Sequence, residues 1–311
     1  YVYQFQTKFR NELRAKSGIM RTREFVMKDL YSFSKDEKEF RTFYESCARA
    51  YKKIFDRCGL PTKMVEADTG AMGGKAAHEF IVPINTASGE SIIFTCEECN
   101  YAATVDKASS IEANFSEDKE SEKPLTKVST PDVKTVEEVT NFLGVTSKRL
   151  VKTLLYKADD KIIAALIRGD HQLNEVKLKN LVGCTTLEMA DATTVEKMTG
   201  AKVGFTGPVG LNNIKIIADS NVTKMKNFVS GANLNDYHLT NVNPNRDFKF
   251  DQVFDLKTAI SGEVCPVCKK GKVSSFYGIE VGNTFMLGTK YSESLGAKFL
   301  DREGKERPFI M

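Results

Sequence analysis

The chain has 311 residues and a mass of 34.7 kDa, which is about the length of two domains. Apolar residues make up 41% and charged residues 28%, and this balance excludes an intrinsically disordered chain. The net charge of +4 neither requires nor excludes a polyanionic partner, because a local basic patch is compatible with a nearly balanced total.

Seven cysteines are too few, and odd in number, for a secreted domain stabilised by disulfides. The sequence contains no run of 18 apolar residues, so we expect no membrane span. The first residues, YVYQFQTKFR, have no initiator Met and none of the features of a signal peptide. We therefore expect a cytoplasmic protein whose numbering begins inside a longer sequence.

Residues 3–14 and 21–29 alternate with a period of two. One side of the first segment is expected to be half-buried and the other is wholly polar. The first side carries Tyr3, Phe5, Thr7, Phe9, Asn11 and Leu13, and the polar side carries Gln4, Gln6, Lys8, Arg10, Glu12 and Arg14. Residues 15–20 indicate a loop and residues 21–29 resume the alternation, so the segment predicts an antiparallel hairpin.

Further along, the capping pair Ser34 and Glu37 starts a predicted helix that ends before Gly59. Strands are expected at 79–84 and 91–96. The stretch 112–138 is acidic and indicates a linker. After it, a helix at 135–144, strands at 150–157, 161–169 and 214–219, and a strand-like stretch at 278–292 are predicted.

Arg10 and Glu12 are two residues apart on the first strand, so their side chains emerge on one face about 7 Å apart. A guanidinium suits a phosphate and a carboxylate suits an exocyclic amine, so the pair could bind a nucleotide. Phe25 and Arg23 of the second strand could add a stacking face and a further phosphate contact. The alternative, from charge pattern alone, is a solvated hairpin surface.

Several longer motifs decide between these alternatives. TKFRNELR followed by RTREFVMKDLYSF resembles motif 2 of class II aminoacyl-tRNA synthetases, in particular the bacterial-type prolyl-tRNA synthetases. ADTGAMGGKAAHEF, RGDHQLNEVKL and GIEVGNTFMLGTKYSE resemble the same family in the same order. The resemblance covers nearly the whole chain.

The resemblance implies an α+β fold in which a class II antiparallel-sheet catalytic core is interrupted by an inserted α/β editing domain. The core would occupy residues 1–122 and resume at 259–311, and the inserted domain would occupy 123–258. The implied function is ATP-dependent activation of proline and its transfer to tRNA(Pro), with hydrolysis of mischarged alanyl-tRNA(Pro).

The resemblance also assigns roles to residues. Arg10 would hold the α-phosphate and the activated carboxylate, Glu12 would read the adenine amino group, and Phe25 would stack on adenine. The implied ATP-binding residues are Arg10, Glu12, Arg21, Arg23, Phe25 and Asp29, with Mg²⁺ accompanying ATP. The implied proline-binding residues are His78, Glu79, Phe80, Asn283 and Gly288.

One of these positions departs from the family, because related enzymes usually have His where this chain has Asn283. Asn cannot carry a charge, so the role of that His does not transfer. Without the longer match, HEF at 78–80 would be interpreted as the edge of a strand whose histidine has ordinary hydrogen-bond partners.

Two CxxC pairs, Cys96 with Cys99 and Cys265 with Cys268, could supply four thiolates to a structural zinc ion. They are much farther apart than the roughly 15 to 20 residues of a compact zinc ribbon, and a domain inserted between the halves of a ribbon would explain the separation. The alternatives are two independent reduced pairs or a redox CxxC.

The segment between the cysteine pairs resembles the editing insertion of the family. The matching residues are Thr130, Lys152, Gly207, Pro208, Asp219 and His238. Lys152 suits a phosphate of the tRNA end, and His238 suits substrate positioning or proton transfer. Taken alone, Lys152 would be a strand lysine with an exposed amine and His238 a surface loop residue.

The resemblance implies tRNA(Pro), proline and ATP as partners and a homodimer, and it implies neither DNA nor a membrane. Motifs 1 and 3 of the family are not recognised, so we expect a central piece that does not aminoacylate unaided. Two other functions remain: a free-standing deacylase within residues 126–256, and a zinc-ribbon RNA-binding module without catalysis. Neither needs Arg10, Glu12 and Phe25.

Overall fold

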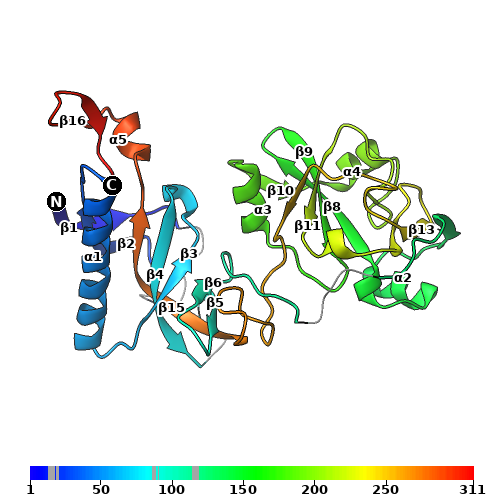
Figure 1. The fold of residues 1–311 in the computed structure, drawn as a ribbon, viewed down its shortest axis with the longest axis horizontal. Helices are drawn as coiled ribbons and strands as arrows, with labels where there is room; N and C mark the ends of the chain where they lie inside the picture. The colour runs from blue at the N-terminus through cyan, green and yellow to red at the C-terminus, as the bar shows by residue number, and fades with distance from the viewer. Residues whose placement is uncertain (13–17, 19–20, 86–88, 90, 114–118) are drawn as a thin grey trace. The chain divides into compact units, whose positions relative to one another are not determined.

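The computed structural model describes residues 1–12, 18, 21–85, 89, 91–113 and 119–311 (Figure 1). The described chain divides into two compact units, one formed by Tyr1–Ser91 with Tyr277–Met311 and one by Ile92–Phe276. The predicted hairpin tip, except Gly18, and residues 114–118 of the acidic stretch lie outside the described residues.

The first unit contains a hairpin, one long helix and an antiparallel sheet (Figure 1). Its strands are β1 (Val2–Phe9), β2 (Glu24–Tyr31), β3 (Lys63–Ala67), β4 (Ala76–Ile84), the main part of β15 (Val273–Met286), β16 (Lys298–Leu300) and β17 (Glu306–Pro308). Its helices are α1 (Glu37–Arg57), the 3-10 turn η1 (Gly70–Met72) and α5 (Lys290–Ser294). β1 pairs with β2, and β4 pairs with β3 on one side and β15 on the other, all antiparallel.

The predicted hairpin is confirmed, but the predicted burial of one of its faces is wrong. Tyr3, Phe5 and Phe9 are 70%, 73% and 77% exposed, and Val26, opposite Thr7 on β2, is also exposed. The alternation of a strand predicts which side chains share a face, but it does not predict what packs on that face. Among the described residues, α1 contacts this face only near its edges, where Phe43 stacks on Tyr1 and Tyr51 lies beside Lys28.

Helix α1 packs its aromatic stripe on β4. The Phe80 ring lies 4.8 Å from the Tyr51 ring and 5.8 Å from the Phe55 ring. Gly282 of β15, opposite Phe80, faces the same rings, and a Cβ there would lie 3.1 Å from Phe55. The close approach explains why the strand carries glycine at this position.

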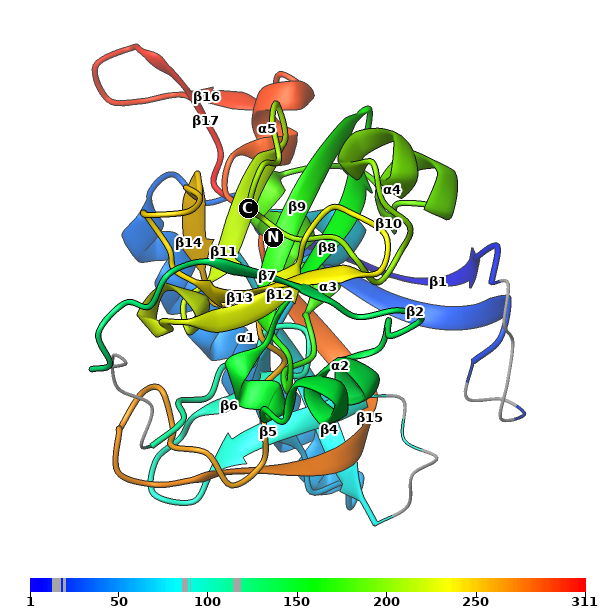
Figure 2. The same cartoon turned by 90° about the vertical axis from the view of Figure 1, so that its right-hand side faces the viewer.

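The second unit contains two sheets (Figure 2). The five-stranded sheet has the order β10 (Leu187–Met189), β8 (Val151–Ala158), β9 (Lys161–Arg168), β11 (Lys215–Asp219) and β14 (Gln252–Phe254). The three-stranded sheet has the order β12 (Phe228–Gly231), β13 (Tyr237–Val242) and β7 (Thr126–Ser129). The other elements are β5 (Ser91–Cys96), β6 (Ala102–Thr104), α2 (Val136–Leu143), η2 (Ser147–Arg149), α3 (Glu175–Val182), α4 (Ala192–Thr199) and η3 (Val222–Lys224).

The core of the second unit lies on both faces of the five-stranded sheet. On one face Val151 and Leu155 of β8 pack with Phe228 and Leu239 of the three-stranded sheet. On the other face Tyr156 packs with residues that include Leu178 of α3. The predicted helix at 135–144 and the predicted strands of this unit are confirmed, with α2 capped by Thr135 and Glu138 at its start and by Gly144 in the left-handed conformation at its end.

The unit that contains the predicted insertion is larger than the insertion itself, since it includes the cysteine-bearing segments on both sides of it. The predicted boundaries at 123 and 258 therefore stay predictions. Among the described helices, none combines the length and the apolar character needed to cross a membrane.

Helix α1 provides a test, because the sequence and the structure identify different N-caps. The sequence favours Ser34, whereas in the structure the Asp36 carboxylate accepts a 2.8 Å bond from the Glu39 amide and Ser34 is bridged to Ile310. We expect Asp36→Ala to lower the free energy of unfolding by about 1 kcal/mol, because it removes the cap.

Ser34→Ala is the matched control. The Ser34 hydroxyl is buried without a hydrogen-bond partner among the described residues, so its removal should cost almost nothing. Urea unfolding followed by far-ultraviolet circular dichroism measures both variants. An equal loss in both would contradict the structural assignment.

Candidate functional site

Thr130 and His238 form the centre of the predicted editing residues. Val128 of β7 pairs with His238 of β13, and Thr130 follows directly after β7. The Thr130 hydroxyl and His238 Nδ1 are 2.7 Å apart, and both residues are almost completely buried. Burial lowers the pKa of His238 because it disfavours the imidazolium, and a hydrogen bond to the Gly204 backbone opposes this shift only in part.

His238 is therefore a neutral ring whose hydrogen bonds join Thr130 to the loop at Gly204. Its 2% exposure does not fit a ring that exchanges protons with a substrate. It fits the other predicted role, positioning of the site.

The loop that carries Gly207 and Pro208 lies against β12. A Cβ on Gly207 would stand 1.8 Å from the Gly231 carbonyl oxygen, so only glycine fits at this position. Asn233 holds the loop. Its Oδ1 accepts from the Gly207 amide at 2.9 Å, and its Nδ2 donates to the Gly207 and Val209 carbonyls at 3.0 and 2.8 Å. Sequence reasoning missed Asn233, whose role depends on a contact 26 residues away.

Lys152 belongs to a second group of side chains. It alternates with Val151 and Thr153 on β8 and therefore shares a side with Leu154 and Tyr156. Its Nζ donates a 2.5 Å hydrogen bond to the His171 carbonyl. Desolvation lowers the pKa of Lys152, and the neighbouring Asp170 carboxylate opposes this shift. The structure thus brings the predicted editing residues together in two groups rather than one.

Asp219, another of the predicted editing residues, lies in the interior of the second unit. It is fully buried, and its oxygens accept backbone N–H groups of Asn221 at 2.9 Å, Leu256 at 2.9 Å and Lys257 at 3.1 Å. A carboxylate used in this way fixes the chain after β14 and does not face a ligand. Among the predicted editing residues, Asp219 thus has contacts that suit a scaffold group.

In the first unit, the predicted nucleotide residues contact one another. The Arg10 guanidinium carbon lies 5.1 Å from the centre of the Phe25 ring, in a cation–π contact. Arg21 Nε lies 3.3 Å from a Glu12 carboxylate oxygen, and Arg23 Nε donates to the Glu12 carbonyl at 2.9 Å. The Arg10 guanidinium thus lies over the Phe25 ring, which was predicted to stack on adenine.

Asp29 lies on the same face of the hairpin as Arg10. Lys8 Nζ is 2.6 Å from its carboxylate and Gln4 donates to it at 3.1 Å. The hydrogen bonds from Lys8 and Gln4 lower the pKa of Asp29. Its charge is therefore partly neutralised within the hairpin.

The predicted proline-binding residues are divided between the two faces of β4 and β15. His78 and Phe80 face α1, and the buried Phe80 ring is part of the core, so its expected contact with a ligand does not fit the structure. Glu79 and Asn283 are opposite each other in register and lie on the other face. Gly288 follows β15 with a φ of +67°, which favours glycine.

His78 has partners that the sequence did not indicate. The Tyr44 hydroxyl is 2.8 Å from His78 Nδ1 and 2.7 Å from the Thr284 hydroxyl, which joins α1, β4 and β15. Desolvation lowers the pKa of His78. Asn283 donates to Glu280 at 3.0 Å on its own strand.

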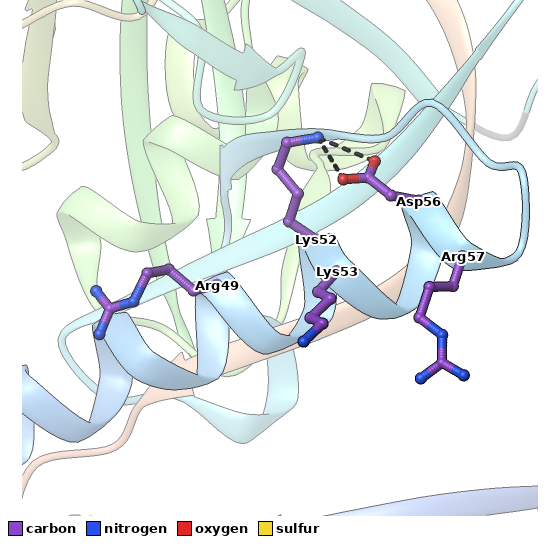
Figure 3. A pocket seen from close by; sticks show the side chains of 5 residues that line it. All are labelled: Arg49, Lys52, Lys53, Asp56 and Arg57. Carbon is purple, nitrogen blue, oxygen red and sulfur yellow. Dashed lines mark hydrogen bonds and ion pairs between the residues drawn. The ribbon is translucent and has the colours of Figure 1, made fainter.

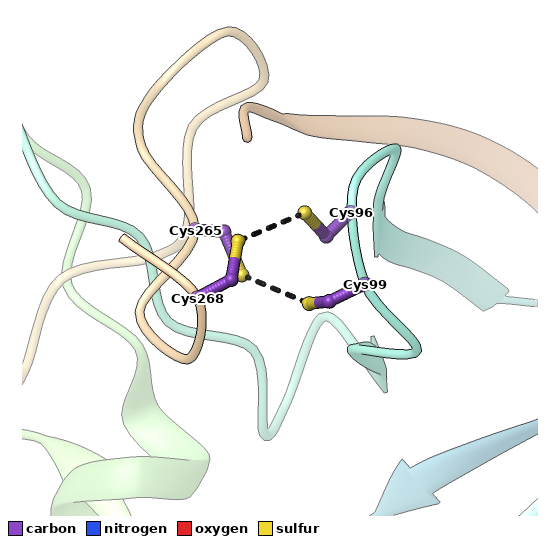
Figure 4. Close-up of side chains that lie close together, drawn as sticks. All are labelled: Cys96, Cys99, Cys265 and Cys268. Atoms are coloured by element: carbon purple, nitrogen blue, oxygen red, sulfur yellow. Dashed lines mark hydrogen bonds between the residues drawn. The ribbon is translucent and has the colours of Figure 1, made fainter. Parts of the chain in front are cut away.

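The four cysteines of the CxxC pairs converge within the second unit (Figure 4). The sulfurs of Cys96 and Cys268 are 3.6 Å apart, and those of Cys99 and Cys265 are 3.7 Å apart. Four thiolates at about 2.3 Å from a tetrahedral zinc ion have S···S edges of about 3.8 Å. The spacing therefore fits a tetrahedral metal site and is far longer than a disulfide bond of about 2.05 Å.

The backbone around the cysteines also fits a metal site. The Glu98 amide donates to Cys96 Sγ at 3.3 Å and the Gly271 amide donates to Cys268 Sγ at 3.4 Å. These donors stabilise thiolates, and the backbone hydrogen bonds of Gly271 and Lys270 lower the pKa of Cys268 to about 6. Gly271 is required here because its Cβ would lie 2.7 Å from Cys96 Sγ.

A basic surface lies on the exposed side of α1 (Figure 3). It is a shallow hollow lined by Arg49, Lys52, Lys53, Asp56 and Arg57. Lys52 and Asp56 form a hydrogen-bonded i, i+4 pair at 3.0 Å. Such pairs are typical of a solvated helix face.

Comparison with known proteins identifies relatives over the whole chain. It is 53% identical over 311 residues to a proline–tRNA ligase of Geobacter sulfurreducens and 52% identical over 317 aligned positions to one of Thermoanaerobacter pseudethanolicus. In both cases all of this chain and 54% of the relative are covered, so the chain spans about half the length of these curated relatives. Residues 130–248 match the family described as the aminoacyl-tRNA editing domain.

These comparisons confirm the resemblance drawn from the motifs. The chain matches a portion of prolyl-tRNA synthetases, and the part of its second unit that matches the editing-domain family has mixed α/β content.

Proposed function

We propose that this chain is part of an enzyme that activates proline with ATP, transfers it to tRNA(Pro) and hydrolyses alanyl-tRNA(Pro). The observation that carries the proposal is the match of the entire chain to proline–tRNA ligases. A free-standing deacylase or a zinc-ribbon RNA-binding module would need only the second unit, whereas the match also includes the hairpin of β1 and β2. The proposal includes Mg²⁺ with ATP, a homodimer and a cytoplasmic location.

In the first unit we propose the synthetic site of a class II catalytic core. Adenylate formation places extra negative charge on the α-phosphorus, and a guanidinium fixed beside it stabilises the transition state electrostatically. Arg10 is suited to this role because it emerges on the polar face of the hairpin beside Glu12 and Phe25. When ATP binds, the phosphate and the adenine would replace the contact that Arg10 and Phe25 make with each other.

The test uses a protein that contains this chain together with the other half of its relatives' length. We expect proline-dependent ATP-pyrophosphate exchange, and we expect Arg10→Ala to reduce its kcat/KM by about 10² to 10³, as for the loss of a donor to a developing anion. Arg57→Ala, which removes an exposed arginine from the basic face of α1, is the control and should leave the rate unchanged. Exchange with another amino acid, or an unaffected Arg10→Ala enzyme, would reject the assignment.

In the second unit we propose hydrolysis of a mischarged ester. Water attacks the ester carbonyl carbon, the bond to the terminal ribose oxygen breaks, and alanine and free tRNA are released. The synthetic site rejects alanine only weakly, because one methylene step provides about 1–3 kcal/mol of discrimination. A second pocket that accepts alanine and is too small for proline is therefore needed. Thr130, His238 and the Gly207 loop, which are fixed by hydrogen bonds, would form one side of this pocket. The Lys152 ammonium is suited to a phosphate of the tRNA end.

The 311-residue chain itself serves for the second test. We expect it to release alanine from alanyl-tRNA(Pro) and to spare prolyl-tRNA(Pro). Lys152→Ala should lower the rate by about 10², because the ester loses its orientation. Lys157→Ala, on an exposed position of the same strand, is the matched control. Equal hydrolysis of both esters, or equal rates of the two variants with unchanged circular dichroism, would contradict the proposal.

We also propose that Cys96, Cys99, Cys265 and Cys268 hold a structural zinc ion. The tetrahedral spacing of the sulfurs and the backbone donors to Cys96 and Cys268 support it. Four protein ligands leave no open position, so zinc would join the chain segments before and after the editing domain and would have no catalytic role.

Elemental analysis tests this site. One zinc per chain is expected, and Cys265→Ser should release it and lower the melting temperature, whereas Cys184→Ser, a cysteine outside the cluster, should change neither. Cobalt substitution should give the absorption of tetrahedral thiolate coordination. Less than about 0.2 zinc per chain in protein purified without chelator would contradict the site.

A further inference from the structure

The RGDHQLNEVK segment, residues 168–177, contains several polar side chains that are unusually buried. Arg168 and His171 are 1% exposed, and Asn174 and Lys177 are 6% and 7% exposed. Most polar groups buried at this level are satisfied by specific partners, and among the described residues His171 Nδ1 is an exception. The partners therefore indicate what the segment does.

These partners lie on the two chain segments that connect the editing domain to the rest of the unit. In the incoming segment, Arg168 Nη2 is 2.7 Å from a Glu112 carboxylate oxygen, and Asn174 Nδ2 donates to the Val105 carbonyl at 2.9 Å. In the outgoing segment, Lys177 Nζ contacts Asp255 at 2.8 Å. Residues 168–177 thus hold the incoming and outgoing segments to the domain.

The turn at 168–171 is rigid. Arg168 forms two hydrogen bonds with Asp170, at 2.6 and 2.8 Å, and the His171 amide donates to the Arg168 carbonyl at 3.0 Å. The Gly169 amide donates to the Leu150 carbonyl at 2.7 Å. A Cβ on Gly169 would stand 2.5 Å from the Ser147 carbonyl oxygen, so the turn is packed as closely as the backbone allows.

The same turn contacts the editing lysine. The His171 carbonyl accepts the 2.5 Å hydrogen bond from Lys152 Nζ described above. Arg168 and Val151 are register partners on β9 and β8, which places the turn directly beside the strand that carries Lys152. A displacement of the turn would therefore move the acceptor that orients the ammonium.

A metal ion is the other explanation for this cluster, since Glu112, His171 and Glu263 each offer a ligand atom within 4.8 Å of the others. Protein cations already occupy these ligands. Arg168 Nη2 lies within 2.7 Å of Glu112 and 2.9 Å of His171 Nε2, and Lys257 Nζ is paired with Glu263. A divalent ion would have to displace both cations, so the cluster is an ion-pair network.

We propose that Arg168 and Glu112 are positioning residues for Lys152: their ion pair fixes the turn 168–171 to the incoming segment, and the turn presents the His171 carbonyl to the lysine. The inference rests on the proposed editing function for its kinetic consequence. Its structural part is independent of that function. The attachment of the domain and the orientation of its lysine are thereby coupled through one turn.

The experiment uses the 311-residue chain with Glu112→Gln, which removes the charge of the pair at nearly constant volume. Asp255→Asn is the matched control, because it breaks the other ion pair between the segment 168–177 and a connecting segment and does not contact the turn. Arg168→Lys is a second test variant, which keeps the charge but cannot bond both carboxylates as the guanidinium does.

Two readouts are taken. The first is the rate at which an amine-reactive ester acylates Lys152, followed by peptide mass spectrometry, which requires no enzymatic activity. We expect it to rise about fivefold in Glu112→Gln and Arg168→Lys, the factor that corresponds to loss of one hydrogen bond, and to stay within about twofold of wild type in Asp255→Asn. The second is deacylation of alanyl-tRNA(Pro), where kcat should fall about fivefold or more in both test variants at unchanged KM.

Equal acylation rates in Glu112→Gln and Asp255→Asn would overturn the proposal, as would a faster acylation that leaves kcat unchanged. If Glu112→Gln does not fold, Arg168→Lys decides by the same criteria. If the wild-type chain does not deacylate, the proposed editing function fails, and the acylation rates still decide whether the ion pair holds the lysine.

Discussion

The second unit depends on holding together two chain segments that are far apart in the sequence. Closing a flexible loop of this length costs about 4 to 5 kcal/mol of entropy, and each segment alone is too short to form a core. Backbone bridges join Ile111 to Val264 and Leu173 to Lys257. The cysteine cluster and the buried polar side chains of residues 168–177 also join these segments, in addition to a small apolar core.

Two buried ion pairs, Arg168 with Glu112 and Lys257 with Glu263, lie where these segments meet. An ion pair removed from water gains little net stability, because desolvation offsets the Coulomb attraction, but leaving one partner alone is costly. Arg168 and Lys257 are both 1% exposed and both are paired. An arrangement of the incoming and outgoing segments that separated either pair would therefore be costly.

Much of the local structure could be predicted from the sequence, because its signals are local. The α2 helix follows from Thr135, Glu138 and Gly144, and β8 and β9 follow from their apolar runs. The α1 cap was wrong by two residues because Asp36 and Glu39 repeat the same signal within half a turn.

The errors at the sites have a common origin in contacts between distant residues. Phe80 was assigned to a ligand because HEF is a motif, yet its face is decided by α1. Asp219 was predicted as an editing residue, and its carboxylate accepts hydrogen bonds from the amides of residues 256 and 257. Asn233 was missed for the same reason. A motif identifies which residues matter, whereas the direction of a side chain depends on what packs against its strand.

The contact between Arg10 and Phe25 shows how two residues with separate expected roles can belong to one site. A cation–π contact at an exposed position is worth about 0.5–1 kcal/mol, whereas a hydrogen bond to a charged group contributes about 1.5–3 kcal/mol. A phosphate would therefore draw the guanidinium away from the ring, and the ring face would become available to a base in the same step. Before that step, the contact restricts the rotamers of a long exposed side chain, which lowers the entropy that binding would otherwise cost. If the hairpin binds a nucleotide as proposed, the Phe25 ring would hold Arg10 near the phosphate position before binding and would stack on the base afterwards.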